Sequence, residues 1–127
     1  MIEKALRYEL IRAIPELSGE IYPTNAPKSA TKPHLVYYRA DTDRNKTLDG
    51  YTDAKALRFY FSIMAVRYDD MKPIADKVEN LLIKMAGLHI GKDMDTYVED
   101  ITIHNIEEGF ENNLKINRGI IDFTIYI

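Results

Sequence analysis

The sequence predicts an α+β fold, a mainly antiparallel sheet of about four strands with two helices packed on one face. Two segments, residues 2–14 and 71–85, place apolar residues at helical spacing, and later segments alternate apolar and polar residues as strands do. This order of elements allows short connections between neighbours. A chain of 127 residues can bury one hydrophobic core, so we expect a single domain spanning residues 1–127.

The first helix is expected over residues 2–14, because Pro15 removes a backbone donor and restricts the residue before it. Residues 15–33 are punctuated by glycine, proline and asparagine. They are expected to form a loop against the body, with one short extended piece at residues 21–22. The next segment, His34–Ala40, is rich in aromatic and β-branched residues and is expected to be a strand.

The segment Asp41–Asp53 holds charged residues, threonine, asparagine and glycine with little apolar content, so we expect a surface loop. Such a loop is longer than a hairpin needs. No apolar anchor offsets the cost of about 1–2 kcal/mol per residue for fixing its backbone. We therefore expect it to be mobile in the isolated chain and ordered against a partner, and expect shortening between Ala40 and Ala54 to leave a folded chain.

The segment Ala56–Tyr68 alternates cleanly and predicts a long strand with two different faces. One face is apolar throughout and belongs to the core: Leu57, Phe59, Phe61, Ile63 and Ala65. The other face carries Arg58, Tyr60, Ser62, Met64 and Val66. Its far end is unusually apolar for a face in water, so we expect a partner to cover it.

The second helix is expected to start at Asp69 or Asp70, because an aspartate can accept bonds from the free donors of a first turn. Gly87 is expected to end it. Two further strands, Tyr97–Glu107 and Lys115–Ile127, are expected to pair as an antiparallel hairpin. The turn between them is expected at Glu108–Asn113, which has turn composition.

Composition excludes several classes of protein. The net charge of −3 argues against a chain held mainly by phosphates, which needs clustered basic residues. The absence of cysteine excludes disulfides, a thiolate nucleophile and a cysteine-based metal site. The first residues are charged where a signal peptide is apolar, and no stretch is apolar enough to span a bilayer. We therefore expect a protein made in the cytoplasm, with no membrane partner.

Catalytic and metal-binding motifs are weak. Residues 41–46 begin like a calcium loop, but Lys46 replaces the required glycine and no bidentate glutamate follows at the right distance. The three histidines have no zinc-site spacing, and His104 lies near Asp100 and Glu107 without forming a recognised catalytic set. The acidic residues of segment 93–111 form either a solvated sheet edge or a surface for a basic partner.

As a layout, the chain resembles the phage tail completion proteins, the head-to-tail joining or tail-terminator family of long-tailed phages and prophages. The resemblance runs nearly from end to end and rests on the order and spacing of short motifs rather than on a catalytic signature. These motifs are Met1–Leu6, Ile21–Pro23 with Ala26–Pro27, Lys32–Tyr38, Thr47–Gly50 and Gly119–Tyr126.

The resemblance implies a structural protein of a virion, made in the cytoplasm of a bacterial host. It would cap the tail tube as a ring, expected to be a hexamer, and offer the surface on which a filled head docks. Its partners would be further copies of itself, the tail tube protein and head-completion proteins. It implies no enzyme activity, no cofactor and no specific nucleic-acid binding, although DNA can pass through such a ring.

The residues agree with this reading, because an outer sheet face and a polar segment are natural contact surfaces. The interface candidates are Asp41, Asp43, Arg44, Lys46, Asp49, Tyr60, Met64 and Val66. Two alternatives remain open. One is a ferredoxin-like regulatory module that binds a small ligand between subunits. The other, with less support, is a small hydrolase or isomerase that uses His104 with nearby carboxylates.

Overall fold

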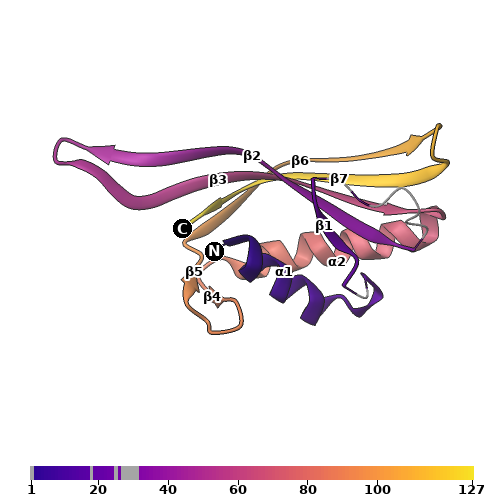
Figure 1. Ribbon diagram of the computed structural model, residues 1–127, viewed down its shortest axis with the longest axis horizontal. Coiled ribbons are helices and arrows are strands. Elements are labelled where there is room, and N and C mark those ends of the chain that lie inside the picture. The colour runs from indigo at the N-terminus through magenta and orange to yellow at the C-terminus, as the bar shows by residue number, and fades with distance from the viewer. Residues whose placement is uncertain (1, 18, 25, 27–31) are drawn as a thin grey trace.

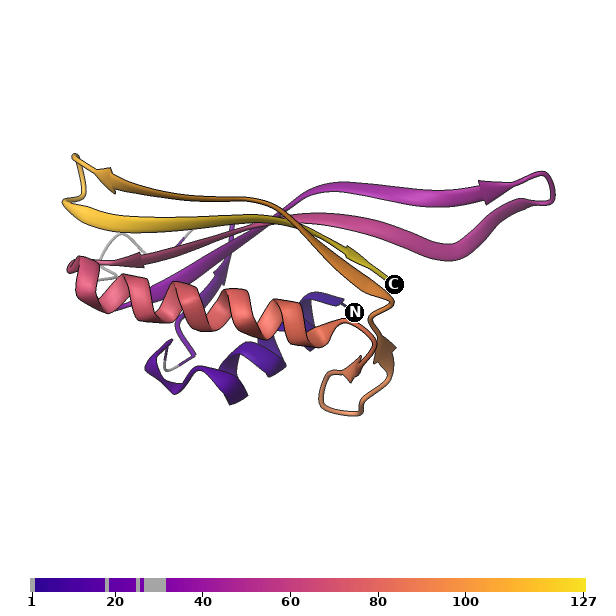
Figure 2. The ribbon, with the colours of Figure 1, turned by 180° about the vertical axis from the view of Figure 1, so that it is seen from behind.

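A twisted five-stranded sheet carries both long helices on one face in a computed structural model that describes residues 2–17, 19–24, 26 and 32–127 (Figures 1 and 2). The sheet order is β1-β2-β3-β7-β6. Its strands are β1 (Ile21–Pro23), β2 (His34–Thr47), β3 (Gly50–Ala65), β6 (Asp100–Glu111) and β7 (Ile116–Tyr126). The predicted α+β class is confirmed, but the expected four strands are five.

The fifth strand is β1, which pairs parallel to β2 with Ile21 opposite Leu35. All other pairs in this sheet are antiparallel. The sequence shows β1 only as a short extended piece, because three residues are too few for a period of two to appear. Part of the loop expected around it, with the Pro27 end of one resemblance motif, lies outside the described residues.

The two predicted helices form as α1 (Ile2–Ala13) and α2 (Tyr68–Met85), and a short 3₁₀ helix, η1 (Pro15–Leu17), follows α1. Pro73 lies inside α2 rather than at its start, so the helix lacks the backbone hydrogen bond that residue 73 would donate to the Asp69 carbonyl. No described helix combines the length and apolar character needed to cross a bilayer.

The core lies between the helices and the face of β3 that alternation predicted. Leu57, Phe59, Phe61, Ile63 and Ala65 are all buried, which confirms the face assignment. Three aromatic rings form its centre, with Phe61 edge-to-face on Phe123 at a centroid distance of 4.8 Å and Phe59 stacked on Phe123 at 5.8 Å. These contacts tie β3 to its neighbour β7 beneath the helices.

The prediction of a surface loop at Asp41–Asp53 is wrong, because these residues continue β2 and β3 as one long hairpin. Thr47 pairs with Gly50, so the turn between the strands contains only Leu48 and Asp49. We call residues 41–54, the distal part of this hairpin, the arm; Figure 1 shows it projecting along the long axis away from the helices. Backbone pairing does not require apolar side chains, which is why composition failed to predict it.

The second half of the chain forms the expected antiparallel hairpin of β6 and β7, with a displaced turn. β6 continues to Glu111 and the turn falls at residues 112–115, beyond the expected Glu108–Asn113. A second small sheet pairs β4 (His89–Ile90) with β5 (Thr96–Tyr97), so Tyr97, the expected first residue of the strand Tyr97–Glu107, lies in a separate short strand. β6 forms an edge of the main sheet.

Candidate assembly surfaces

The arm is a two-stranded ribbon with irregular pairing. A register shift separates Arg39 from Asp41, so an extra residue of β2 sits at the base of the arm, and such bulges bend and twist a hairpin. A second shift lies between Arg44 and Lys46. At the tip, the Thr47 hydroxyl donates to the Gly50 carbonyl at 3.3 Å, so the two ends of the turn are joined.

Among the described residues, no third strand pairs with the arm beyond Lys55. Lys55 exchanges backbone hydrogen bonds with Ile127, 2.9 and 3.0 Å long, and β7 ends there. Every side chain from Asp41 to Asp49 is exposed. Because an isolated two-stranded hairpin is marginally stable in water, this ribbon gains support when another chain packs on it.

The arm tip carries two exposed apolar side chains. Leu48 is fully exposed, and the Tyr51 ring is 68% exposed with the Lys46 ammonium 5.1 Å from its centroid. The interface candidates predicted in this segment are its charged residues, and neither Leu48 nor Tyr51 is among them. The sequence signal that marks Leu48 as a contact candidate is a leucine inside an otherwise polar turn.

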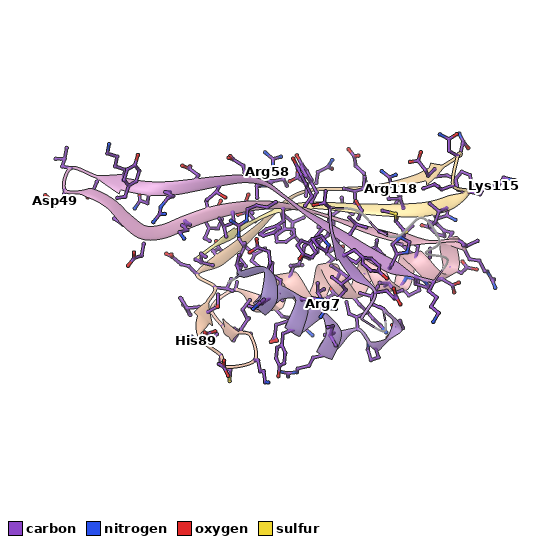
Figure 3. All side chains as sticks on the ribbon, in the orientation of Figure 1. Arg7, Asp49, Arg58, His89, Lys115 and Arg118 are labelled. Carbon is purple, nitrogen blue, oxygen red and sulfur yellow. The ribbon has the colours of Figure 1, made fainter. Side chains whose placement is uncertain are left out.

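The sheet face opposite the helices is the second candidate surface, and we call it the outer face. Figure 3 shows Arg58 and Arg118 on this side and Arg7 on the helical side. Tyr38 and Tyr60 stack there in adjacent strands, with centroids 6.3 Å apart and planes 9° from parallel. The expected outward position of Tyr60 is confirmed.

A bidentate ion pair between Arg58 and Asp122 joins β3 and β7 on the outer face. Arg58 donates from Nε to Asp122 Oδ1 at 2.9 Å and from Nη2 to Asp122 Oδ2 at 2.6 Å. The hydrogen bond from Arg58 lowers the pKa of Asp122 below its usual value, and the same bond raises the pKa of Arg58. This pair was missed because the two residues are 64 positions apart and only strand register brings them together.

Met64 also lies on the outer face, half-buried, with His34 opposite it in β2 and Arg118 opposite it in β7. Val66 does not, because β3 ends at Ala65. Its side chain is 54% exposed, and its carbonyl accepts a 3.0 Å hydrogen bond from Asn117 Nδ2. The structure thus brings Tyr60 and Met64 together, places Asp41, Asp43, Arg44, Lys46 and Asp49 along the arm, and leaves Val66 apart from both groups.

The acidic strand β6 is partly neutralised by residues from elsewhere in the chain. Glu108 accepts hydrogen bonds of 2.8 Å from Lys72 Nζ and from the Tyr68 hydroxyl, and these bonds lower the pKa of Glu108. Glu111 pairs with Arg118. The strand is thus an exposed sheet edge with the charges of Glu108 and Glu111 paired within the chain.

His104 does not lie in a recognised catalytic arrangement. Its Nε2 lies 2.6 Å from the Thr124 hydroxyl, a contact between neighbouring strands β6 and β7. In the described part of the chain, no group of three or more histidine, aspartate or glutamate residues could hold a metal ion.

Comparisons with known proteins bear on the fold. No family profile and no curated protein matches the chain. Among solved structures, a chain from "Virion of native gene transfer agent (GTA) particle" superposes with a TM-score of 0.68 and 13% sequence identity. The fold recurs in a virion particle. The superposition covers 98% of this chain and 96% of that chain, so the likeness extends over the helices, the sheet and the arm together.

Proposed function

We propose that this chain is a structural assembly protein of a phage, prophage or phage-like particle. In this role it caps the tail tube as a ring, expected to be a hexamer, and provides the surface on which a filled head docks. Its partners are further copies of itself, the tail tube protein and head-completion proteins, and its site is the junction of head and tail. The role requires no cofactor and no catalysis.

The observation that carries this proposal is the end-to-end likeness to a chain of a gene transfer agent virion particle. The likeness is one of fold, since only 13% of residues are identical. Two of the short motifs that resemble the tail completion family lie at strands of this fold: Lys32–Tyr38 leads into β2, and Gly119–Tyr126 lies within β7. Two independent comparisons, one of motifs and one of shape, therefore support the same class of protein.

The contact surfaces suit a ring subunit. The helices cover one sheet face and leave the outer face with its tyrosine stack and Met64 open to a neighbour. The arm extends beyond the body, where it can reach an adjacent subunit or the chains above and below the ring. An extended element of this kind offers much contact area for few residues.

Shortening the arm in a phage or prophage host tests the proposal. Replacing residues 45–54 with Asn-Gly keeps Arg44 opposite Lys55 and closes the hairpin with a two-residue turn. The shortened chain should fold, because none of residues 45–54 belongs to the core, whose first residue in β3 is Leu57. The host should then produce filled heads and separate tails that fail to join, counted by electron microscopy.

Wild-type chain supplied from a plasmid is the matched control and should restore joined particles. The thermal unfolding of the purified shortened chain should match that of the wild type, so that a failure of joining cannot be a failure of folding. Mass spectrometry of purified particles should detect the wild-type chain. Absence of the chain from particles, or normal infectious particles with the shortened arm, contradicts the proposal.

A further inference from the structure

A groove lies on the helical side of the molecule, between the last turns of α1 and α2 and strand β4. It encloses about 200 Å³ of open space. Its apolar lining includes Leu81, Met85, Leu88 and Ile90, and Leu88 is 52% exposed. A space of this order accommodates a hydrophobic group of several carbon atoms. The groove is thus an apolar recess that the described part of the chain leaves open.

The rim of the groove is mainly basic. Arg12 and Lys84 both line it, and the side chain of Arg12 is 67% exposed. Glu9 lies 4.0 Å from Arg12 and offsets part of this charge. An occupant that matches the groove should therefore have an apolar end with negative charge beside it.

The arm tip has these two properties. Leu48 is its fully exposed apolar end, and Asp49 follows directly. Over residues 41–53, four aspartates stand against Arg44 and Lys46, so the segment has a net charge of −2. The tip is also narrow, because only two residues connect β2 to β3. Leu48 with the adjacent Asp49 therefore forms an exposed apolar knob beside a carboxylate, while an apolar recess with a mainly basic rim lies elsewhere on the same chain.

The two sites cannot meet within one molecule as the hairpin stands. Figure 3 places Asp49 at the far end of the arm and His89, which lines the groove, on the helical side of the body. Contact between them must join two copies. A patch that meets a different patch on the next copy produces a head-to-tail contact, which closes into a ring when the rotation between copies permits.

We propose that the arm tip of one copy docks with Leu48 in the α1–α2 groove of a second copy of this chain. Asp49 then lies near the Arg12 and Lys84 rim, and Leu48 covers Leu88. The ribbon beyond Lys55 gains the support that it lacks in a single chain. The biological setting of this contact, a ring at the head–tail junction, rests on the proposed function.

Two variants disable the two sides of the contact. Leu48→Lys places a charge on the knob that the basic rim repels, and Leu88→Lys places one in the recess; both side chains are exposed, so neither change should disturb the fold. Leu114→Asp, at the tip of the β6–β7 hairpin, is the matched control because that leucine is 66% exposed. Sedimentation equilibrium over a range of concentrations measures the mean mass.

The wild type and the Leu114 variant should associate as concentration rises. Each disabled variant should need at least about a tenfold higher concentration, the usual effect of removing one central apolar contact. Wild-type association by either disabled variant overturns the proposal. So does a wild type that remains monomeric throughout.

Mixing the two disabled variants gives the sharper result. The Leu88 variant retains an intact arm and the Leu48 variant retains an intact groove, so an equimolar mixture should form one-to-one dimers that grow no further. Failure of the mixture to form dimers overturns the head-to-tail contact. This result is independent of the proposed function, because detection of the chain in purified particles tests that role separately.

Discussion

At the scale of single residues, the centre of the core depends on three phenylalanines in mutual contact, Phe59, Phe61 and Phe123. Phe61 is buried against Phe59 and Phe123. Replacing Phe61 with alanine should lower the free energy of unfolding by about 3–5 kcal/mol, because it removes apolar contacts and leaves a cavity. Urea unfolding measures the change.

Phe110→Ala is the control for this prediction, since the Phe110 ring is 54% exposed. It should change the free energy of unfolding by no more than about 0.5 kcal/mol. Equal effects from the two substitutions would show that the face assignment of β3 is wrong.

The pair of Arg58 and Asp122 gives the chain an acid-sensitive contact. The pKa of Asp122 is lowered in the folded chain by the hydrogen bond from Arg58. Its stabilising contribution is therefore present above the pKa of an unfolded aspartate, near 4, and is lost as the pH falls through the lower folded pKa. Asp122→Asn should lower the free energy of unfolding at pH 7. On acidification, that free energy should then fall less than it does in the wild type.

Urea unfolding at pH 7 and pH 3 compares this variant with the wild type. Asp43→Asn, in the exposed arm, is the control and should leave the pH dependence unchanged. An Asp122 variant with the same acid dependence as the wild type would show that the pair does not contribute to it.

At the scale of elements, α2 approaches β7 closely at Gly119. A Cβ atom at this position would lie 3.0 Å from Met71 Sδ and 3.5 Å from Ala75 Cβ. Met71 is fully buried, so it has little room to move. Gly119→Ala should therefore destabilise the chain by about 1–3 kcal/mol through overpacking.

Gly109→Ala is the matched control in the adjacent strand, because no atom lies within 4 Å of a Cβ built there. It should be neutral to within about 0.5 kcal/mol. Thermal unfolding compares the two variants, and equal stability of both would contradict the close packing of α2 on β7.

The arm should be the part of the hairpin that opens most readily in an isolated chain. Amides of residues 45–54 pair only within the ribbon, whereas those of β3 from Leu57 onward lie between two strands. Because local opening depends on buried contacts, arm amides should exchange hydrogen faster than the paired amides of Leu57–Ala65. Native-state exchange read by mass spectrometry measures this. Equal protection would show that the arm needs no partner.

The elements that the sequence predicts best are long enough to repeat their helical or strand period several times and have one buried face. α2 and β3 each bury an apolar set in one repeating pattern, and both elements form, although the strand expected over Ala56–Tyr68 is Gly50–Ala65 and α2 begins at Tyr68. The sequence predicts a loop where the arm lies, because the cross-strand pairing of the arm uses backbone groups, which leave no signal in the amino-acid composition. The short strands β1, β4 and β5 have two or three residues, too few for any period to appear.

The prediction of interface candidates is limited in the same way as the prediction of elements. Alternation placed Tyr60 and Met64 on the outer face, but it carried Val66 along because the sequence does not mark the end of β3 at Ala65. The ion pair of Arg58 with Asp122 depends on strand register, and the groove depends on how α1 meets α2. Neither is encoded by local spacing.

At the scale of the whole molecule, the helices occupy one face of the sheet and leave the outer face for a neighbour. Met64→Glu should weaken assembly, because burying a new carboxylate at an interface costs desolvation energy. The isolated fold should tolerate the change, since Arg118 lies opposite position 64 in β7. Incorporation into particles, compared by mass spectrometry, measures the effect.

Met94→Glu is the control, because Met94 is 67% exposed and lies between β4 and β5 on the helical side. It should leave incorporation unchanged. Wild-type incorporation of the Met64 variant would remove the outer face from the set of assembly surfaces.

The continuity of β2 and β3 from the arm into the body has a mechanical consequence. A force that pulls the tip along the long axis acts parallel to β3, which is bonded to β7 from Ala56 to Ala65. The tension must shear many hydrogen bonds of that ladder at the same time instead of breaking them one by one. The hairpin is therefore anchored in the centre of the sheet. A pull on its tip should meet high resistance, although the outer part of the hairpin is only two strands wide.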